Sequence, residues 1–174
     1  TLVTGPTREI APAAVRIVEV ESAWEMLAAV EAALPADVAI FAAAVADWRA
    51  ADASDRKIKK DGSGVIPDLK LAENPDILAT IAQRAVGDRP PLVVGFAAET
   101  DDVIANAIAK RKRKGCDWIV ANDVSGDVMG GGRNAVTIID ERGEEAWPEA
   151  DKTEVARRLA HRIADWLARE TASC

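Results

Sequence analysis

The stretch Phe41-Ala-Ala-Ala-Val-Ala-Asp47-Trp48-Arg49 carries the clearest structural signal in this chain. Small apolar residues that end in one carboxylate predict a buried parallel strand over Val38 to Ala46, which delivers Asp47 to the carboxyl edge of a sheet. Open α/β sheets bind their ligands at this edge. Alanine side chains leave room for a flat ligand to touch the strand's backbone, whose N–H and C=O groups can read the edge of a base. The stretch therefore predicts a nucleotide site.

Strands and helices alternate outward from this stretch. Apolar runs and turn residues predict strands over residues 1–4, 16–20, 65–71, 92–96 and 118–121. Capping residues and helical periodicity predict helices over residues 23–34, 74–84, 100–114 and 153–169. Residues 136–139 and 144–147 are expected to form a C-terminal hairpin. The pattern predicts one α/β domain over residues 1–174, a three-layer Rossmann-like sandwich with a mostly parallel sheet.

Composition excludes several classes of function. The net charge of −7 disfavours a nucleic-acid partner, and no apolar run approaches the roughly 20 residues that cross a bilayer. Two cysteines are too few for a disulfide framework, so a reducing cytoplasm is expected. The single histidine, His161, lies among arginines on an expected helix and is interpreted as a solvated surface residue. One histidine is too few for a histidine-based zinc site, and its expected surface position disfavours a catalytic triad.

Lysines and arginines concentrate in two windows. Nine of the 22 fall within residues 56–60 and 110–114, and two basic clusters on an acidic body suit a small anion. Lys57, Lys59 and Lys60 lie in an expected loop and could neutralise a triphosphate or an acyl phosphate; the alternative is a solvated surface. Lys110 and Lys114 share one helix face, where the alternative to phosphate binding is a favourable interaction with the helix dipole.

Three further places could contact a nucleotide. Asp47 could hold a ribose hydroxyl or a divalent cation, or could simply cap its loop. The segment Asn74-Pro75-Asp76-Ile77 exposes backbone N–H groups to an anion or a base, or forms an ordinary capped helix start. Phe96 follows Gly95 at a strand and could stack on a base, or could belong to the core.

Two common nucleotide motifs are missing. The run Gly130-Gly131-Gly132 lacks the preceding strand and following helix of a phosphate loop or dinucleotide fingerprint, and is interpreted as a mobile loop. The chain contains no tyrosine, which excludes a short-chain dehydrogenase, because that class relies on a tyrosine and lysine pair. A Rossmann-type reductase is therefore disfavoured.

Five segments in order resemble one family, phosphopantothenoylcysteine synthetase, the ligase half of the bacterial bifunctional coenzyme A biosynthesis protein. They are residues 42–49, 57–60, 74–77, 94–100 and 119–123, and the resemblance runs from Thr1 to about Trp166. It implies a CTP-dependent ligase, with Mg²⁺, that joins 4′-phosphopantothenate to cysteine. The substrate's carboxylate attacks the α-phosphate of CTP and releases pyrophosphate. The amine of cysteine then takes the acyl group from the acyl-cytidylate and releases CMP.

The resemblance also implies site residues and an assembly. Lys57 would be the catalytic lysine, and Asp47 would lie near the ribose or the metal. The implied nucleotide contacts are Ala43, Ala44, Asp47, Lys57, Asn74, Pro75, Asp76, Ile77, Phe96, Lys110 and Lys114. A homodimer is implied, with residues 65–71 as a pairing arm and residues 52–64 as a flap that closes over the site.

The chain also departs from the family pattern. The family opens with a Gly-Gly-Thr segment and an Asn-Arg-Ser-Ser-Gly stretch, which provide a first strand and helix and a phosphate-binding turn; neither occurs here. Met129 stands where the family usually has phenylalanine. The flavin-dependent decarboxylase half that is often fused in bacteria is also absent. The alternative function is thus a nucleotide-binding or dimerisation module without catalysis.

Overall fold

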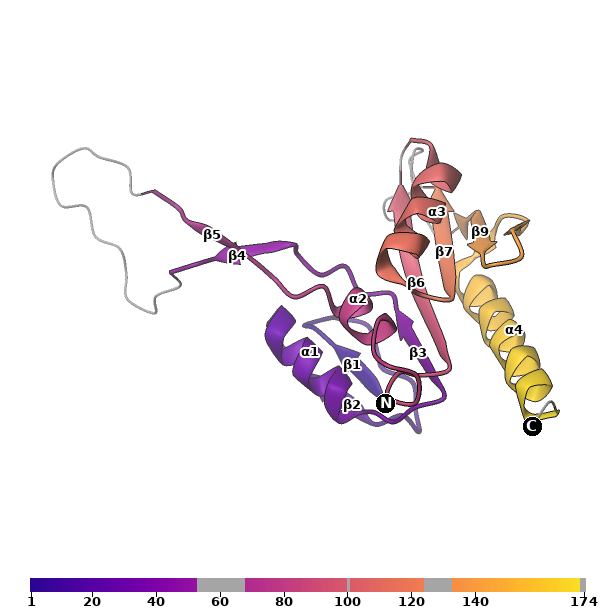
Figure 1. Cartoon of the computed structure of the whole chain (residues 1–174), viewed down its shortest axis with the longest axis horizontal. Coiled ribbons are helices and arrows are strands. Elements are labelled where there is room, and N and C mark those ends of the chain that lie inside the picture. The colour runs from indigo at the N-terminus through magenta and orange to yellow at the C-terminus, as the bar shows by residue number, and fades with distance from the viewer. Residues whose placement is uncertain (53–67, 100, 124–132, 173–174) are drawn as a thin grey trace, which may run out of the picture.

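The structure is a computed structural model that describes residues 1–52, 68–99, 101–123 and 133–172. Its centre is a five-stranded sheet with the order β10-β9-β7-β6-β3 (Figure 1). The strands are β3 (Val38–Phe41), β6 (Leu92–Glu99), β7 (Trp118–Asp123), β9 (Val136–Ile139) and β10 (Glu144–Ala146). The first three are parallel, and the β9–β10 hairpin joins antiparallel to β7. The predicted α/β class and C-terminal hairpin are confirmed.

Helices cover both faces of this sheet. Side chains of β6 alternate between the faces, because successive residues of a strand point to opposite sides. Val93 and Ala97 pack with residues of α2 (Ile77–Ala82) and α3 (Val103–Lys114). Leu92 and Val94 pack on the other face with residues of α4 (Lys152–Ala172). The two apolar clusters give the predicted three layers.

The N-terminal residues form a small unit beside the sheet. Strand β1 (Leu2–Thr4) pairs in parallel with β2 (Ile17–Glu19), and this pair is separate from the five-stranded sheet. Helix α1 (Ala23–Ala32) follows, and Ser22 and Glu25 form a capping box at its start, as the sequence predicts for Ser22. An ion pair between Glu31 and Arg84 links α1 to the segment after α2.

A two-stranded ribbon projects from the body. Strand β4 (Trp48–Ala50) pairs antiparallel with β5 (Leu71–Glu73), and Figure 1 shows the ribbon extending away from the helices. A second short pair, β8 (Arg133–Asn134) with β11 (Ala150–Asp151), lies at the start of α4. The ribbon presents exposed apolar side chains, among them Trp48 and Leu71.

Several element boundaries differ from the sequence prediction. The strand expected over residues 38–46 ends at Phe41, since among the described strands β3 pairs with β6 alone and their last partners are Phe41 and Gly95. The helix expected from residue 74 begins at Ile77, because Asp76 acts as its N-cap. The strand expected over residues 65–71 is observed at 71–73, and residues 65–67 lie outside the described ranges.

Gly95 allows helix α2 to lie directly on the sheet. A Cβ atom at this position would come within 2.7 Å of Leu78 Cδ2 and 2.9 Å of Ile119 Cδ1. Ile119 is fully buried, which limits how far it can move away. The missing side chain therefore sets the close approach of α2 to β6.

Gly95→Ala should destabilise the fold by about 1–3 kcal/mol, because the added methyl group overpacks this contact. Urea unfolding measures the change. Ala98→Ser, at an exposed position of the same strand, is the control and should stay within about 0.5 kcal/mol of the parent. Equal effects of the two substitutions would contradict the close packing at Gly95.

Candidate nucleotide site

Asn74 joins two segments that are distant in the sequence. Its backbone N–H donates to the carbonyl of Asp47 at 2.8 Å, and its side-chain Nδ2 donates to the carbonyl of Ala46 at 2.8 Å. These bonds continue the β4–β5 ladder to the entrance of α2. They bring the stretch after β3 beside the segment 74–77, as the nucleotide interpretation requires.

Asp76 connects the start of α2 to the end of α3. Its Oδ1 accepts a hydrogen bond of 3.0 Å from the backbone N–H of Ala79, which caps the helix. Its Oδ2 forms an ion pair with Nζ of Lys114. Gln83, at the other end of α2, donates from Nε2 to the carbonyl of Arg113 at 3.1 Å. Both ends of α2 are thus tied to the last turn of α3.

These contacts also lower the pKa of Asp76. Partial burial acts to raise the pKa of this carboxyl group, but the hydrogen bonds from Lys114 and the Ala79 N–H, together with the charges of Lys114 and Arg113, outweigh it. The pKa of Asp76 therefore lies below the ordinary value of aspartate, and the carboxylate is charged at neutral pH.

Lys110 lies one turn before Lys114 on the same side of α3. Both side chains are half-buried, whereas Lys112 and Arg113 are exposed. This arrangement matches the expected shared face of the two lysines. Within the described residues Lys110 forms no ion pair, so its ammonium group is available to an anionic ligand. Two cations, one paired and one unpaired, therefore lie along the face of α3 where α2 is attached.

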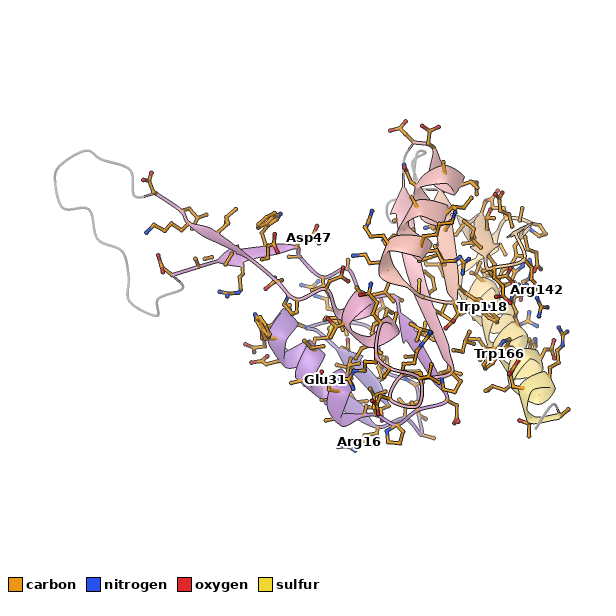
Figure 2. The ribbon with its side chains drawn as sticks, in the orientation of Figure 1. Arg16, Glu31, Asp47, Trp118, Arg142 and Trp166 are labelled. Atoms are coloured by element: carbon orange, nitrogen blue, oxygen red, sulfur yellow. The ribbon has the colours of Figure 1, made fainter. Side chains whose placement is uncertain are left out.

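The remaining predicted contacts of the stretch after β3 are open to solvent. Ala43, Ala44 and Asp47 are exposed, and they lie beyond the end of β3 rather than within it. Figure 2 labels Asp47 near the base of the projecting ribbon. Its carboxylate has no hydrogen-bond or ion-pair partner among the described residues. An unengaged carboxylate is available to a ribose hydroxyl or a cation.

A single carboxylate suits Mg²⁺, which proteins commonly hold through one or two carboxylates together with substrate phosphates. Across the described ranges, no group of three His, Cys, Asp or Glu side chains could hold a metal ion by itself. The exposed Asp47 carboxylate therefore fits a role as one ligand of Mg²⁺, and the other oxygen ligands would have to come from a bound nucleotide.

Phe96 does not join the cluster of Asp76 and Lys114. It packs against the apolar cluster on the α4 face of the sheet, opposite to the face that carries α2 and α3. Pro75 and Ile77 flank Asp76 as expected, and Ile77 is buried. Lys57, Lys59, Lys60, the expected flap and Met129 lie outside the described residues. Their predicted roles stay predictions.

A second polar feature was not predicted from the sequence. A groove of about 630 Å³ lies between α4 and the β9–β10 hairpin, lined by residues that include Trp118, Trp166 and Arg142, labelled in Figure 2. Arg162 pairs there with Asp140 at 3.0 Å and with Glu145, and stacks over the Trp118 ring at 5.0 Å. The paired charges attach α4 to the hairpin. His161 also lines the groove and is exposed, as expected.

Cys116 offers no reactive thiolate. Its side chain is buried, and burial raises the pKa of the thiol to about 11. Nucleophilic chemistry by this cysteine is therefore disfavoured at neutral pH.

Comparison with known families identifies the fold. The model of the DNA/pantothenate metabolism flavoprotein C-terminal domain matches residues 1–167. The chain belongs to this family. It is 38% identical over 170 residues to the coenzyme A biosynthesis bifunctional protein CoaBC of Vibrio cholerae, covering 96% of this chain and 42% of that protein. The corresponding values for CoaBC of Escherichia coli K12 are 41% over 167 residues, 94% and 41%.

A solved structure shows the same relationship. The crystal structure of the C-terminal domain of CoaBC superposes with a TM-score of 0.72 and 34% identity, and covers 96% of this chain and 74% of that chain. This chain therefore spans less than half the length of the two curated relatives, and corresponds to the C-terminal-domain part of CoaBC. The predicted family is confirmed. Among the described helices, none has the length and hydrophobicity to traverse a bilayer.

The ion pair of Asp76 predicts a pH-dependent stability difference. A carboxyl group with a lowered pKa in the folded state stabilises the fold above its unfolded pKa, and loses this contribution as the pH falls through the folded value. Asp76→Asn keeps a good N-cap but removes the charge. The parent should exceed this variant by a few tenths of a kcal/mol at pH 6, since Asp76 is nearly half exposed.

Urea unfolding at several pH values measures this difference. It should hold above about pH 4, the ordinary pKa of aspartate, and decline as the pH falls below that value towards the lower pKa of the folded state. Glu141→Gln, at an exposed carboxylate of the hairpin turn, is the control and should show no such pattern. A parent-minus-variant difference that is constant from pH 6 to pH 2 would contradict the ion pair.

Proposed function

We propose that this chain is a phosphopantothenate–cysteine ligase domain that uses CTP and acts in coenzyme A biosynthesis. The single observation that carries the proposal is the cluster of Asn74, Asp76 and Lys114, which joins a helix start, a cation and the stretch after β3. The family membership and the names of the CoaBC relatives support the reaction class. CTP, magnesium, the homodimer and a cytoplasmic location are parts of the proposal.

The reaction joins two anions, so charge has to be screened. The carboxylate of 4′-phosphopantothenate attacks the α-phosphate, the bond to the β-phosphate oxygen breaks, and pyrophosphate leaves. The amine of cysteine then attacks the acyl carbon, loses a proton and displaces CMP. Lys110 and Lys114 would stabilise the negative charge on the phosphates, and Lys57 would contribute from its own segment. Bound magnesium would neutralise phosphate charge beside Asp47.

Base recognition would come from the backbone. The segment 74–77 leads into α2, where the first N–H groups of a helix have no partner in the preceding turn. Ala43 and Ala44 are small and exposed, so they leave space beside this segment. Backbone donors and acceptors at fixed positions would distinguish the Watson–Crick edge of cytosine from that of adenine. This is the physical basis of the proposed preference for CTP.

The projecting ribbon supports the proposed homodimer. A two-stranded ribbon is marginal by itself in water, and this one exposes Trp48, Leu69 and Leu71. A second copy of the chain would cover these apolar side chains. It would also place a second surface near Asp47, which lies at the base of the ribbon.

A nucleotide-binding or assembly module without catalysis is the second candidate. The observation that favours it is the incomplete sheet: in the described chain β1 and β2 form their own pair and do not hydrogen-bond to β3. Such a module would bind CTP but would release no pyrophosphate.

Thermal-shift measurement of CTP against ATP, each with Mg²⁺, tests nucleotide choice. CTP should raise the melting temperature more than ATP at equal concentration, because ligand binding to the folded state alone stabilises it. Pyrophosphate release with 4′-phosphopantothenate and cysteine then separates the ligase from the module. Equal shifts with CTP and ATP would contradict the proposed base recognition.

Lys114→Gln should weaken CTP binding about tenfold, the scale of one charge-assisted contact to phosphate. Lys112→Gln is the matched control, because it removes the same charge from an exposed position of the same helix. It should change the affinity less than about twofold. Isothermal titration calorimetry measures both variants. A similar loss of CTP affinity in both variants would contradict a direct contact between Lys114 and phosphate, and would indicate a general effect of net charge.

A further inference from the structure

The ion pair at the start of α2 poses an electrostatic problem for the proposed site. In the proposed function Lys114 binds phosphate, and in this structure its Nζ is paired with the Asp76 carboxylate. An incoming phosphate would meet this negative charge at short range, and like charges repel. The carboxylate must therefore share Lys114 with the ligand or give it up.

The surroundings of the pair show why Lys114 needs a counter-ion when no phosphate is bound. The Lys114 side chain is only 20% exposed, and an ammonium group that is largely withdrawn from water is costly without a partner. Asp76 is 45% exposed and is also held by the Ala79 N–H through its other oxygen. It can therefore remain bonded and partly hydrated when Lys114 changes partner. Lys114 therefore depends on the ion pair more than Asp76 does.

The backbone around Lys114 is held by contacts that do not involve its side chain. The carbonyl of Arg113 accepts a hydrogen bond from Gln83, and Gly115 ends the helix in a left-handed conformation with φ of 74°. Only the flexible stem of the lysine would need to move. A short movement of Nζ from carboxylate to phosphate would leave α2 and α3 in place.

We propose that the Asp76 side chain is the resident counter-ion of Lys114, and that a phosphate group of the bound nucleotide displaces it. This inference rests on the proposed nucleotide function. It assigns the Asp76 carboxylate to the control of phosphate affinity, whereas the proposed base contact involves only the backbone of the segment. The carboxylate keeps Lys114 in position before phosphate binds and lowers the affinity for the charged ligand.

Asp76→Asn tests the exchange with little structural change. Asparagine is as good an N-cap as aspartate, so α2 should remain capped, and circular dichroism and thermal unfolding verify this. Isothermal titration calorimetry with CTP and Mg²⁺ should show binding about two- to fivefold tighter than in the parent, the scale of a half-exposed charge contact. Cytidine, which lacks phosphate, should bind the two proteins equally.

A double-mutant cycle with Lys114→Gln separates local exchange from general charge. Without the lysine, Asp76→Asn should change CTP affinity by less than about 1.5-fold, because no exchange remains. An undiminished gain in that background would overturn the counter-ion role in favour of long-range repulsion. Unchanged or weaker CTP binding by Asp76→Asn alone would also overturn it, while the proposed function stands. Failure of the parent and all variants to bind CTP would overturn both.

Discussion

Helix α2 lies close to strand β6 at Gly95, and this contact fixes where the start of α2 meets the candidate site. A side chain larger than hydrogen at this position would meet Leu78 and Ile119. Because α2 lies directly on the sheet, its first residue falls beside the end of α3, where Asp76 and Lys114 pair. The segment before α2 in turn reaches the stretch after β3 through Asn74. The absence of a side chain at Gly95 thus allows the packing that positions the candidate site.

The site combines elements that the sequence separates by many residues. Asn74 supplies main-chain and side-chain bonds to residues 46 and 47, and Asp76 supplies the cap and the ion pair. These contacts are made by short polar side chains next to a proline, which holds the chain extended before the helix starts. The proposed nucleotide chemistry therefore depends on a rigid helix start rather than on a glycine-rich loop. The groove beside α4 is lined by paired charges on another part of the sheet.

Much of the fold could be predicted from local patterns, and the errors have physical causes. Apolar runs located β6, β7 and β9, and Ser22 located the start of α1. The strand after Val38 was predicted too long, because a run of alanines is equally compatible with irregular backbone when no neighbouring strand pairs with it. The shared face of Lys110 and Lys114 followed from helical spacing. The pairing of Lys114 with Asp76 could not be predicted, since it depends on how two helices pack. The same holds for the opposite sheet faces of Phe96 and Lys114.

Chemical-shift mapping of the ¹⁵N-labelled chain during titration with CTP and Mg²⁺ tests the central claim most directly. We expect the largest changes at the backbone amides of residues 76–78 and 114, with little change along the hairpin. Saturating changes centred on Trp118 and Arg142, with residues 76–78 unaffected, would contradict it. The nucleotide would then occupy the groove beside α4, and the helix start at Asp76 would be purely structural.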